Sequence, residues 1–380
     1  MQPPIGSGLP DMVYMVTAKS WFRADALLWW TKSMPVSQPI VTTGSLADSA
    51  PGAIGQPGTK VLFGANNYSY NYVGGIRLET GVWFDPGRVV GVEAGYFVLI
   101  EQERDYSNQS NIVGNPLIAR PTINATTGVQ TAYYDSLPGT VAGGVTVKLR
   151  SEFQGANCDG AFNLIQTRSV RVDGIGGFRY LNLAESMNVS DQFVDPLGGT
   201  RAFAGAPINF NDSLSVFDGI HTTNSFYGGG GGARFYYAEG RWYITALGKV
   251  ALGPMQEVAT VLGTSSQTDQ TGHTTTVPGG VLANSATMGR YYQSVFAVAP
   301  EGRLNFGYQI TPLITMRVGY TFIYVSNVAR PGDQVTRVVN PGQVPTDRAY
   351  SPTASNLTAF QFHTSSYWAQ GLNFGLDFRF

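Results

Sequence analysis

The last nine residues of the chain alternate between apolar side chains and side chains that are polar or very small. In order they are Leu372, Asn373, Phe374, Gly375, Leu376, Asp377, Phe378, Arg379 and Phe380. Successive side chains of a β-strand point to opposite faces, so a strand here would have one apolar face and one polar face. The stretch therefore predicts a two-faced β-strand at the carboxyl end of the sequence.

The same two-residue period recurs along the chain. In 313–327, for example, Met316 and Val318 fall on one face, and Thr315 and Arg317 on the other. Ten such stretches are found, at 20–32, 68–84, 88–104, 147–163, 168–189, 214–238, 241–262, 290–308, 313–327 and 368–380. Each is long enough for a tilted membrane-crossing strand, which needs about 9–11 residues.

The links between these stretches alternate in length. Short links lie at 85–87, near Ile165, at 239–240 and at 309–312. Long links, rich in Gly, Pro, Ser, Thr and Asn, lie at 33–67, 105–146, 190–213, 263–289 and 328–367. This rhythm is typical of an outer-membrane barrel with tight periplasmic turns and long extracellular loops.

These patterns predict an all-β fold, an antiparallel transmembrane β-barrel of about ten strands. Because ten is even, both termini would lie on the periplasmic side. We expect one barrel domain over 20–380, preceded by a periplasmic segment over 1–19. The first residues do not resemble a secretion signal, so we expect that signal to have been removed or to precede the sequence.

The composition agrees with a barrel and argues against several other classes. Charged residues make up 13% of the chain, where about 25% is usual, and there are 47 glycines. The most apolar run, 89–100, carries Glu93, so no apolar run reaches the 18 residues of a membrane helix. A net charge of −1 gives no reason to expect that the protein binds nucleic acid. A lone Cys158 and three scattered histidines predict no metal site and no cofactor.

The strands of a soluble β-sandwich or propeller would also alternate between apolar and polar residues. Their polar face should carry many lysines, however, and lysine is rare in the ten stretches. Aromatic residues cluster near stretch ends, as in the belts of membrane barrels. Beside the short links these are Phe22, Phe84, Trp242, Tyr308, Phe378 and Phe380, and at opposite ends are Trp30 and Trp368. The membrane barrel is therefore the favoured interpretation.

Several landmarks resemble an outer-membrane β-barrel porin family that is abundant in planctomycete bacteria. They are Trp21-Phe22-Arg23-Ala24-Asp25-Ala26-Leu27-Leu28-Trp29-Trp30, Leu62-Phe63-Gly64, Gly74-Gly75-Ile76-Arg77, Asn224-Ser225-Phe226-Tyr227-Gly228-Gly229, Gly248-Lys249-Val250-Ala251-Leu252-Gly253, Phe296-Ala297-Val298-Ala299-Pro300-Glu301, Val318-Gly319-Tyr320, Ser326-Asn327-Val328-Ala329-Arg330-Pro331-Gly332-Asp333-Gln334 and Trp368-Ala369-Gln370-Gly371-Leu372-Asn373-Phe374-Gly375-Leu376. The resemblance spans nearly the whole chain. It implies a porin-like protein of the bacterial outer membrane and brings no catalytic residues.

The C-terminal pattern also suggests partners. The alternation Phe374, Leu376, Phe378, Phe380 resembles the signal read by bacterial barrel-insertion machinery. The expected partners are therefore that machinery and the lipid bilayer of the outer membrane, and homo-oligomerisation is left open.

Charged residues concentrate on the face opposite the apolar one, which we predict to line the lumen. An outward Arg or Lys at the bilayer midplane would cost roughly 2–4 kcal/mol. The predicted lumen-lining cations are Arg23, Arg77, Arg171, Arg179, Arg234, Lys249, Arg303, Arg317 and Arg379, and the anions are Asp25, Glu79, Glu93, Asp159, Asp173, Glu301 and Asp377. The apolar parity changes near 154–156, which predicts a β-bulge there.

Three functions are compatible with such a barrel. The first is a narrow channel for ions or small solutes, because ten strands lie near the narrow end of barrel widths. The second is a closed structural or adhesive barrel that presents its extracellular loops. The third, an outer-membrane hydrolase, could draw on the loop residues His273, His363, Asp269 and Asp347. No motif groups these four, so we expect no enzyme.

Two local motifs have ordinary structural interpretations. The glycines of 228–232 lead into Arg234 and continue a strand pattern, so a phosphate-binding loop is disfavoured. The stretch 330–333 predicts a turn after the ninth strand. The alternative is that Arg330 and Asp333 line the mouth of the pore.

Overall fold

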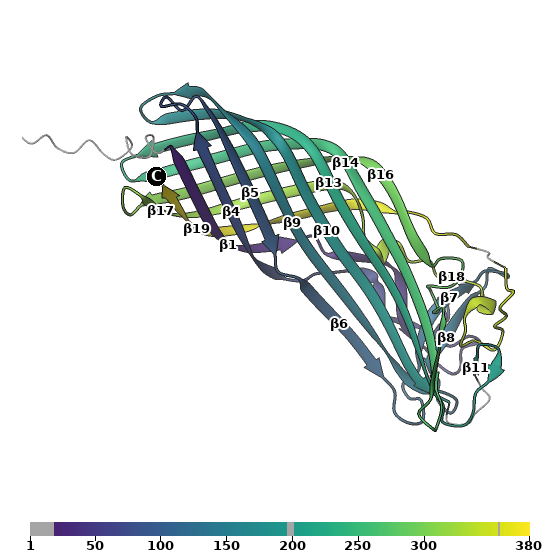
Figure 1. Ribbon diagram of the computed structural model, residues 1–380. Coiled ribbons are helices and arrows are strands. Elements are labelled where there is room, and N and C mark those ends of the chain that lie inside the picture. Colours follow the sequence, from purple (N-terminus) through teal and green to yellow (C-terminus); the bar gives the residue numbers. More distant parts are fainter. Residues whose placement is uncertain (1–18, 196–200, 356–357) are drawn as a thin grey trace, which may run out of the picture.

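The computed structural model describes residues 19–195, 201–355 and 358–380, so the expected periplasmic segment 1–19 lies outside them except for Lys19. Ten strands form the main body (Figure 1). They are β1 (Ser20–Thr31), β4 (Tyr72–Trp83), β5 (Val90–Leu99), β9 (Ala142–Gln166), β10 (Val170–Val194), β13 (Ser213–Glu239), β14 (Trp242–Thr268), β16 (Gly289–Gln309), β17 (Ile314–Ala329) and β19 (Thr364–Arg379).

These ten strands close into an antiparallel barrel, which confirms the predicted fold. The order is β10-β13-β14-β16-β17-β19-β1-β4-β5-β9, and β9 pairs back onto β10. The first and last strands are neighbours, with Asp25 opposite Gly375. Lys19 donates its backbone N–H to the carbonyl of Phe380 at 2.9 Å, so both ends of the barrel sequence meet at the end with the short turns. No helix in the described ranges is long and apolar enough to cross a membrane.

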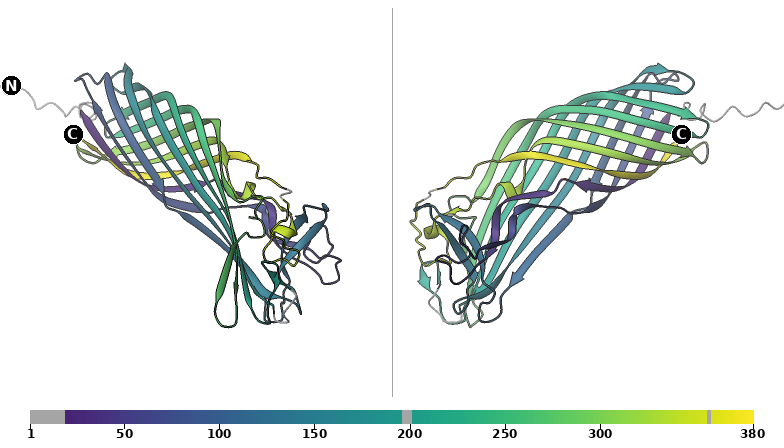
Figure 2. Two further views of the ribbon diagram at one scale, coloured as in Figure 1. Left: turned by 45° about the vertical axis from the view of Figure 1, so that its right-hand side comes forward. Right: turned by 180° about the vertical axis from the view of Figure 1, so that it is seen from behind.

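The strands differ greatly in length. β13 and β14 each have 27 residues, whereas β1 and β4 have 12. At about 3.3 Å per residue the difference amounts to roughly 50 Å of additional strand. Figures 1 and 2 show the four long strands β9, β10, β13 and β14 reaching far past the short ones at the end opposite the termini. β6 (Gln102–Gln109) extends this part along β9, and β15 (Thr274–Pro278) extends it along β14.

A second sheet, which the sequence did not predict, packs against the tall strands. It has the order β18-β7-β2-β3, with β8 paired to β7. Its strands are β2 (Met34–Thr43), β3 (Lys60–Tyr68), β7 (Ile118–Asn124), β8 (Gln130–Ser136) and β18 (Val338–Val339). The segments 33–67, 105–146 and 328–367 are therefore partly strand. We call this sheet, the tall ends of β9, β10, β13 and β14, and the associated strands and loops the outer lobe.

The remaining elements of the outer lobe are short. They are β11 (Ala202–Phe203), β12 (Ala206–Pro207), η1 (Pro331–Asp333) and η2 (Pro341–Gln343). Between the small sheet and the tall strands lies a buried apolar cluster that includes Ile40, Phe63, Val147, Val189 and Val216. This cluster, rather than any local periodicity, holds the small sheet in place.

The predicted bulge at 154–156 is wrong. β9 and β10 pair without interruption there, with Gly155 opposite Leu181, and their register shifts instead between Val172 and Asp173. The apolar side chains change from one face of the strand to the other because the strand passes from the membrane into the outer lobe. Near the turns the apolar side chains of β10 face lipid, as Phe178 does, and in the outer lobe they face inward, as Val189 does.

Candidate functional site: the barrel interior

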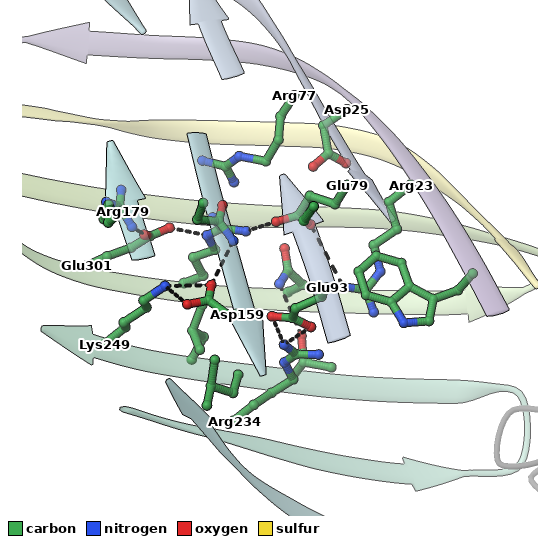
Figure 3. Close-up of a pocket in the computed structure, with 18 of the residues that line it drawn as sticks. Arg23, Asp25, Arg77, Glu79, Glu93, Asp159, Arg179, Arg234, Lys249 and Glu301 are labelled. Carbon is green, nitrogen blue, oxygen red and sulfur yellow. Dashed lines mark hydrogen bonds and ion pairs between the residues drawn. The ribbon is translucent and has the colours of Figure 1, made fainter. Parts of the chain in front are cut away.

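A cluster of ion pairs fills the interior of the membrane-spanning part of the barrel. Figure 3 shows charged side chains from many strands converging on one small cavity. Twelve of the sixteen residues predicted to line the lumen surround it, namely Arg23, Asp25, Arg77, Glu79, Glu93, Asp159, Arg179, Arg234, Lys249, Glu301, Arg303 and Arg317. The cavity measures about 40 Å³. Since a water molecule needs roughly 10–15 Å³ of such space, only about three would fit.

Most charges in this cluster are paired across the barrel, although its seven cations outnumber its five anions. Arg317 pairs with Asp25 at 2.7 Å, and Lys249 with Asp159 at 2.5 Å. Further pairs join Arg234 to Glu93, Arg179 to Glu301, and Arg303 to both Glu79 and Glu301. Strands far apart in sequence are thereby tied together through the interior.

The other four predicted lumen residues lie closer to the end with the short turns. Arg171 pairs with Asp173 at 2.8 Å, and Arg379 pairs with Asp377 at 2.9 Å. Arg23 joins this group to the main cluster through Asp377 at 3.4 Å. The structure therefore brings all sixteen residues into the interior, and fifteen of them take part in the ion pairs described, Arg77 being the exception.

Arg77 lies at the end of the ion cluster that faces the outer lobe. Its Nη1 donates to the Thr321 hydroxyl at 3.1 Å, while Nε and Nη2 are buried without a hydrogen-bond partner. The guanidinium carbon lies 5.1 Å from the ring centroid of Trp29 and 5.7 Å from that of Phe97. These distances allow cation–π attraction, which partly offsets the cost of the unpaired nitrogens.

Between Arg77 and the outer lobe the interior becomes apolar, a feature that the sequence analysis missed. Trp29, Phe97, Phe153 and Tyr367 form a chain of ring contacts with centroid separations of 5.5, 5.3 and 5.0 Å. Together with Phe226 we call these five the aromatic layer. Each is at most 5% exposed, so the layer is packed like a protein core. The lumen is not uniformly polar, contrary to the assignment of apolar faces to lipid alone.

The aromatic layer is capped by a fully buried ion pair between Arg330 of the loop 328–367 and Glu185 of β10. Arg330 donates through Nε and Nη2 to the two carboxylate oxygens of Glu185, at 2.5 and 2.7 Å, and both side chains are fully buried. The side chain of Asn224 exchanges two hydrogen bonds with the backbone of Ala329, at 2.8 and 2.7 Å. Arg330 therefore anchors the loop, and the alternative that placed it at a pore mouth is wrong.

A second buried arginine holds the outer lobe together. Arg120 of β7 donates through Nη1 to Asp191 at 2.7 Å and to Asp218 at 2.9 Å. Asp218 also accepts from the backbone N–H of Ala283 at 2.7 Å. Nearby, Asp135 of β8 has no hydrogen-bond partner on either carboxylate oxygen, and burial together with Asp191 raises its pKa well above the usual value.

The residues considered for hydrolysis do not assemble into a catalytic group. Asp269 and His273 share one hairpin turn, in which the Asp269 carboxylate accepts the backbone N–H of His273 at 3.0 Å. That contact shapes a turn and leaves the imidazole out of the pair. In the part of the chain that the structure describes, no group of three or more His, Cys, Asp or Glu residues is arranged to hold a metal ion.

The sequence matches a protein-family model over residues 21–380, and the description of that family is "Putative beta barrel porin-7 (BBP7)". No curated protein has a significant match to the sequence.

Solved barrels show a distant likeness. Outer membrane protease OmpT from Escherichia coli has 10% identity and a TM-score of 0.42, with 99% of each chain covered. A major outer membrane protein from Thermus thermophilus has 11% identity and a TM-score of 0.24, covering 95% of this chain and 99% of that one. A Pseudomonas aeruginosa FadL homologue has 5% identity and a TM-score of 0.25, covering 94% and 89%. All three TM-scores are below 0.5, so the fold rests on the strand pairing and the family match.

Proposed function

Since this chain belongs to the beta barrel porin-7 family and so lies in the bacterial outer membrane, we propose that it is a closed barrel that anchors and presents the outer lobe. The observation that carries the proposal is the filled interior. The ion cluster leaves space for about three waters, and the aromatic layer above it is packed.

The energetics of opening support a closed state. A water-filled path would expose the side chains of the aromatic layer, at roughly 1.5–3 kcal/mol for each Phe-sized group. Five such groups amount to on the order of 10 kcal/mol, comparable to the whole stability of a typical domain. It would also separate buried ion pairs, each of which leaves an uncompensated charge when one partner moves away.

A narrow channel for ions or small solutes is the second candidate. The family description favours it, and so does the water-sized cavity between the ion pairs. Conduction would require the aromatic layer to move aside, because Trp29, Phe153 and Phe226 lie in the path. The two candidates therefore differ in one measurable property, the resting conductance.

Single-channel recording in a planar bilayer tests the proposal. The folded full-length protein should show no discrete current steps. The mobility of the unboiled protein on a gel verifies that the barrel is folded, so silence in the bilayer then reports a closed interior. Discrete steps from the unmodified protein, with a defined reversal potential in a salt gradient, would replace the closed barrel with the channel.

A further inference from the structure

The outer lobe contains a cavity that the proposed function does not use. It has a volume of about 260 Å³, just below the range for small-molecule sites, roughly 300–1,000 Å³. Its walls come from the tall strands β13 and β14 and from the loop 328–367. Most of the lining is apolar, including Ile220, Val261, Leu282, Val335 and Phe360.

The rim of this cavity reaches solvent, and one wall is an aromatic side chain. Gln38, Gln361 and His363 line the cavity and are exposed, so they mark an entrance from outside. Phe360 is held in place by stacking on Tyr291, with ring centroids 4.1 Å apart and planes 10° apart. A ligand could therefore enter from the external medium and pack against a fixed ring.

Arg337 also lines this cavity, and its charge is unpaired. The residue is only 6% exposed. Its Nη2 donates to the side-chain oxygen of Gln130 at 2.8 Å, but Nε and Nη1 are buried without a hydrogen-bond partner. Burial lowers its pKa, and no neighbouring carboxylate opposes that effect. Residues 196–200 and 356–357 contain no Asp or Glu.

Of the other three buried arginines of the outer lobe, Arg201 donates to the backbone carbonyl of Tyr134, and Arg120 and Arg330 show what Arg337 lacks. Arg120 contacts two aspartates and Arg330 contacts one glutamate. In the described residues Arg337 alone among these three forms no ion pair. A buried guanidinium without an anion is costly, and two unsatisfied donors add to that cost. Nε and Nη1 have almost no exposed surface, so an anion that enters through the rim reaches them only when the Arg337 side chain turns toward the cavity.

We propose that this cavity binds a small amphipathic carboxylate, with its anionic group at Arg337 and its apolar body against Ile220, Val261 and Phe360. A planar guanidinium is suited to carboxylate recognition, and the apolar walls favour a ring or short alkyl chain. One cation matches one negative charge, so a monoanion fits better than a dianion such as phosphate. The site does not depend on whether the barrel conducts.

Titration calorimetry with the full-length protein in nanodiscs tests this site, with benzoate as the probe and benzamide as its neutral counterpart. Empty nanodiscs correct for partition into lipid. Benzoate should bind at least tenfold more tightly than benzamide. Arg337→Met should abolish that preference, whereas the control Arg348→Met, at an exposed position outside the cavity, should keep it.

Several results would overturn the site. These are no benzoate binding, equal binding of benzoate and benzamide, or equal competition by inorganic phosphate. A charge preference that survives Arg337→Met would do the same. If that variant does not show the gel mobility of a folded barrel without boiling, Arg337→Gln takes its place, and the benzoate–benzamide difference in the unmodified protein still decides the matter.

Discussion

The membrane-spanning part of the barrel and the outer lobe use the same strands in opposite ways. On β10, Phe178 faces lipid while Arg179 faces the interior; further along, Ser190 faces outward and Val189 inward. The strand keeps its pairing through the change. What inverts is the solvent outside, from hydrocarbon to water. The apolar face of a strand therefore identifies its surroundings as well as its inner and outer sides.

The two regions also differ in how they bury charge. In the membrane-spanning part, cations and anions form a dense cluster around a cavity of about 40 Å³. In the outer lobe, Arg120 and Arg330 lie among apolar side chains with two carboxylates and one carboxylate, respectively. Removing one partner should therefore cost most in the outer lobe, where neighbouring charges offer little compensation.

The largest effect is expected for Glu185→Ala. This change leaves Arg330 buried without its carboxylate, a loss of about 3–5 kcal/mol. Urea unfolding of the folded barrel measures it, together with protease sensitivity of the loop 328–367. Glu185→Gln retains the shape and one acceptor, so it should lose less. Equal stability of Glu185→Ala and the unmodified protein would show that this pair does not anchor the loop.

A pair of substitutions on one strand tests where the surroundings change. Phe178→Arg places a charge in lipid and should cost about 2–4 kcal/mol if it lies near the midplane. Ser190→Arg places the same charge in water and should cost less than about 0.5 kcal/mol. Refolding from urea into lipid vesicles gives both values. Similar costs at the two positions would contradict the boundary between them.

The strands were predictable from the sequence because the bilayer forces a strict two-residue period on them. The aromatic layer was not, because Trp29 continues the inward face of Arg23 and Asp25, and alternation cannot separate an apolar core from a polar lumen. The small sheet was hidden by its prolines. Pro39 lies within β2 and Pro121 within β7, positions that argue against a central strand.

The inward face of each charge in the ion cluster could be predicted from the sequence, but the pairing of the charges could not. Each charge could be assigned to the interior from the cost of placing it in lipid. Whether the charges pair or leave a path depends on contacts such as Arg317 with Asp25, which join residues 292 positions apart. Arg330 and Arg337 lie in a loop with no periodicity, so nothing in the sequence distinguished an anchor from a binding residue.

A smaller effect, with a defined pH dependence, is expected at Asp135 in the outer lobe. Arg120, Arg201, Asp191 and Asp218 surround it, and its pKa in the folded protein is raised above the unfolded value of about 3.9. The folded state then holds the proton more tightly, so stability falls as the pH rises from about 4 toward the raised pKa.

Asp135→Asn removes that titration. It should flatten the decline of stability with pH and stabilise the protein at pH 8, by on the order of 1 kcal/mol. At pH 4 it should have little effect, because the carboxyl is protonated in much of both states there. Urea unfolding across pH 4–8 checks this. A steeper decline in the variant would reverse the assigned sign.

The smallest effect is expected for the exposed pairs on the outer face of β6 and β9. Arg150 pairs with Glu103 at 2.6 Å, but the two side chains are 44% and 37% exposed. Water and mobile ions compete with such a pair, so Glu103→Ala should cost less than about 1 kcal/mol. The cost should shrink further in 1 M salt, where charges are screened over about 3 Å. The cost of Glu185→Ala should hardly change with salt, because no ion reaches Arg330. If both costs respond equally to salt, the distinction between a buried anchor and a solvated surface in the outer lobe is wrong.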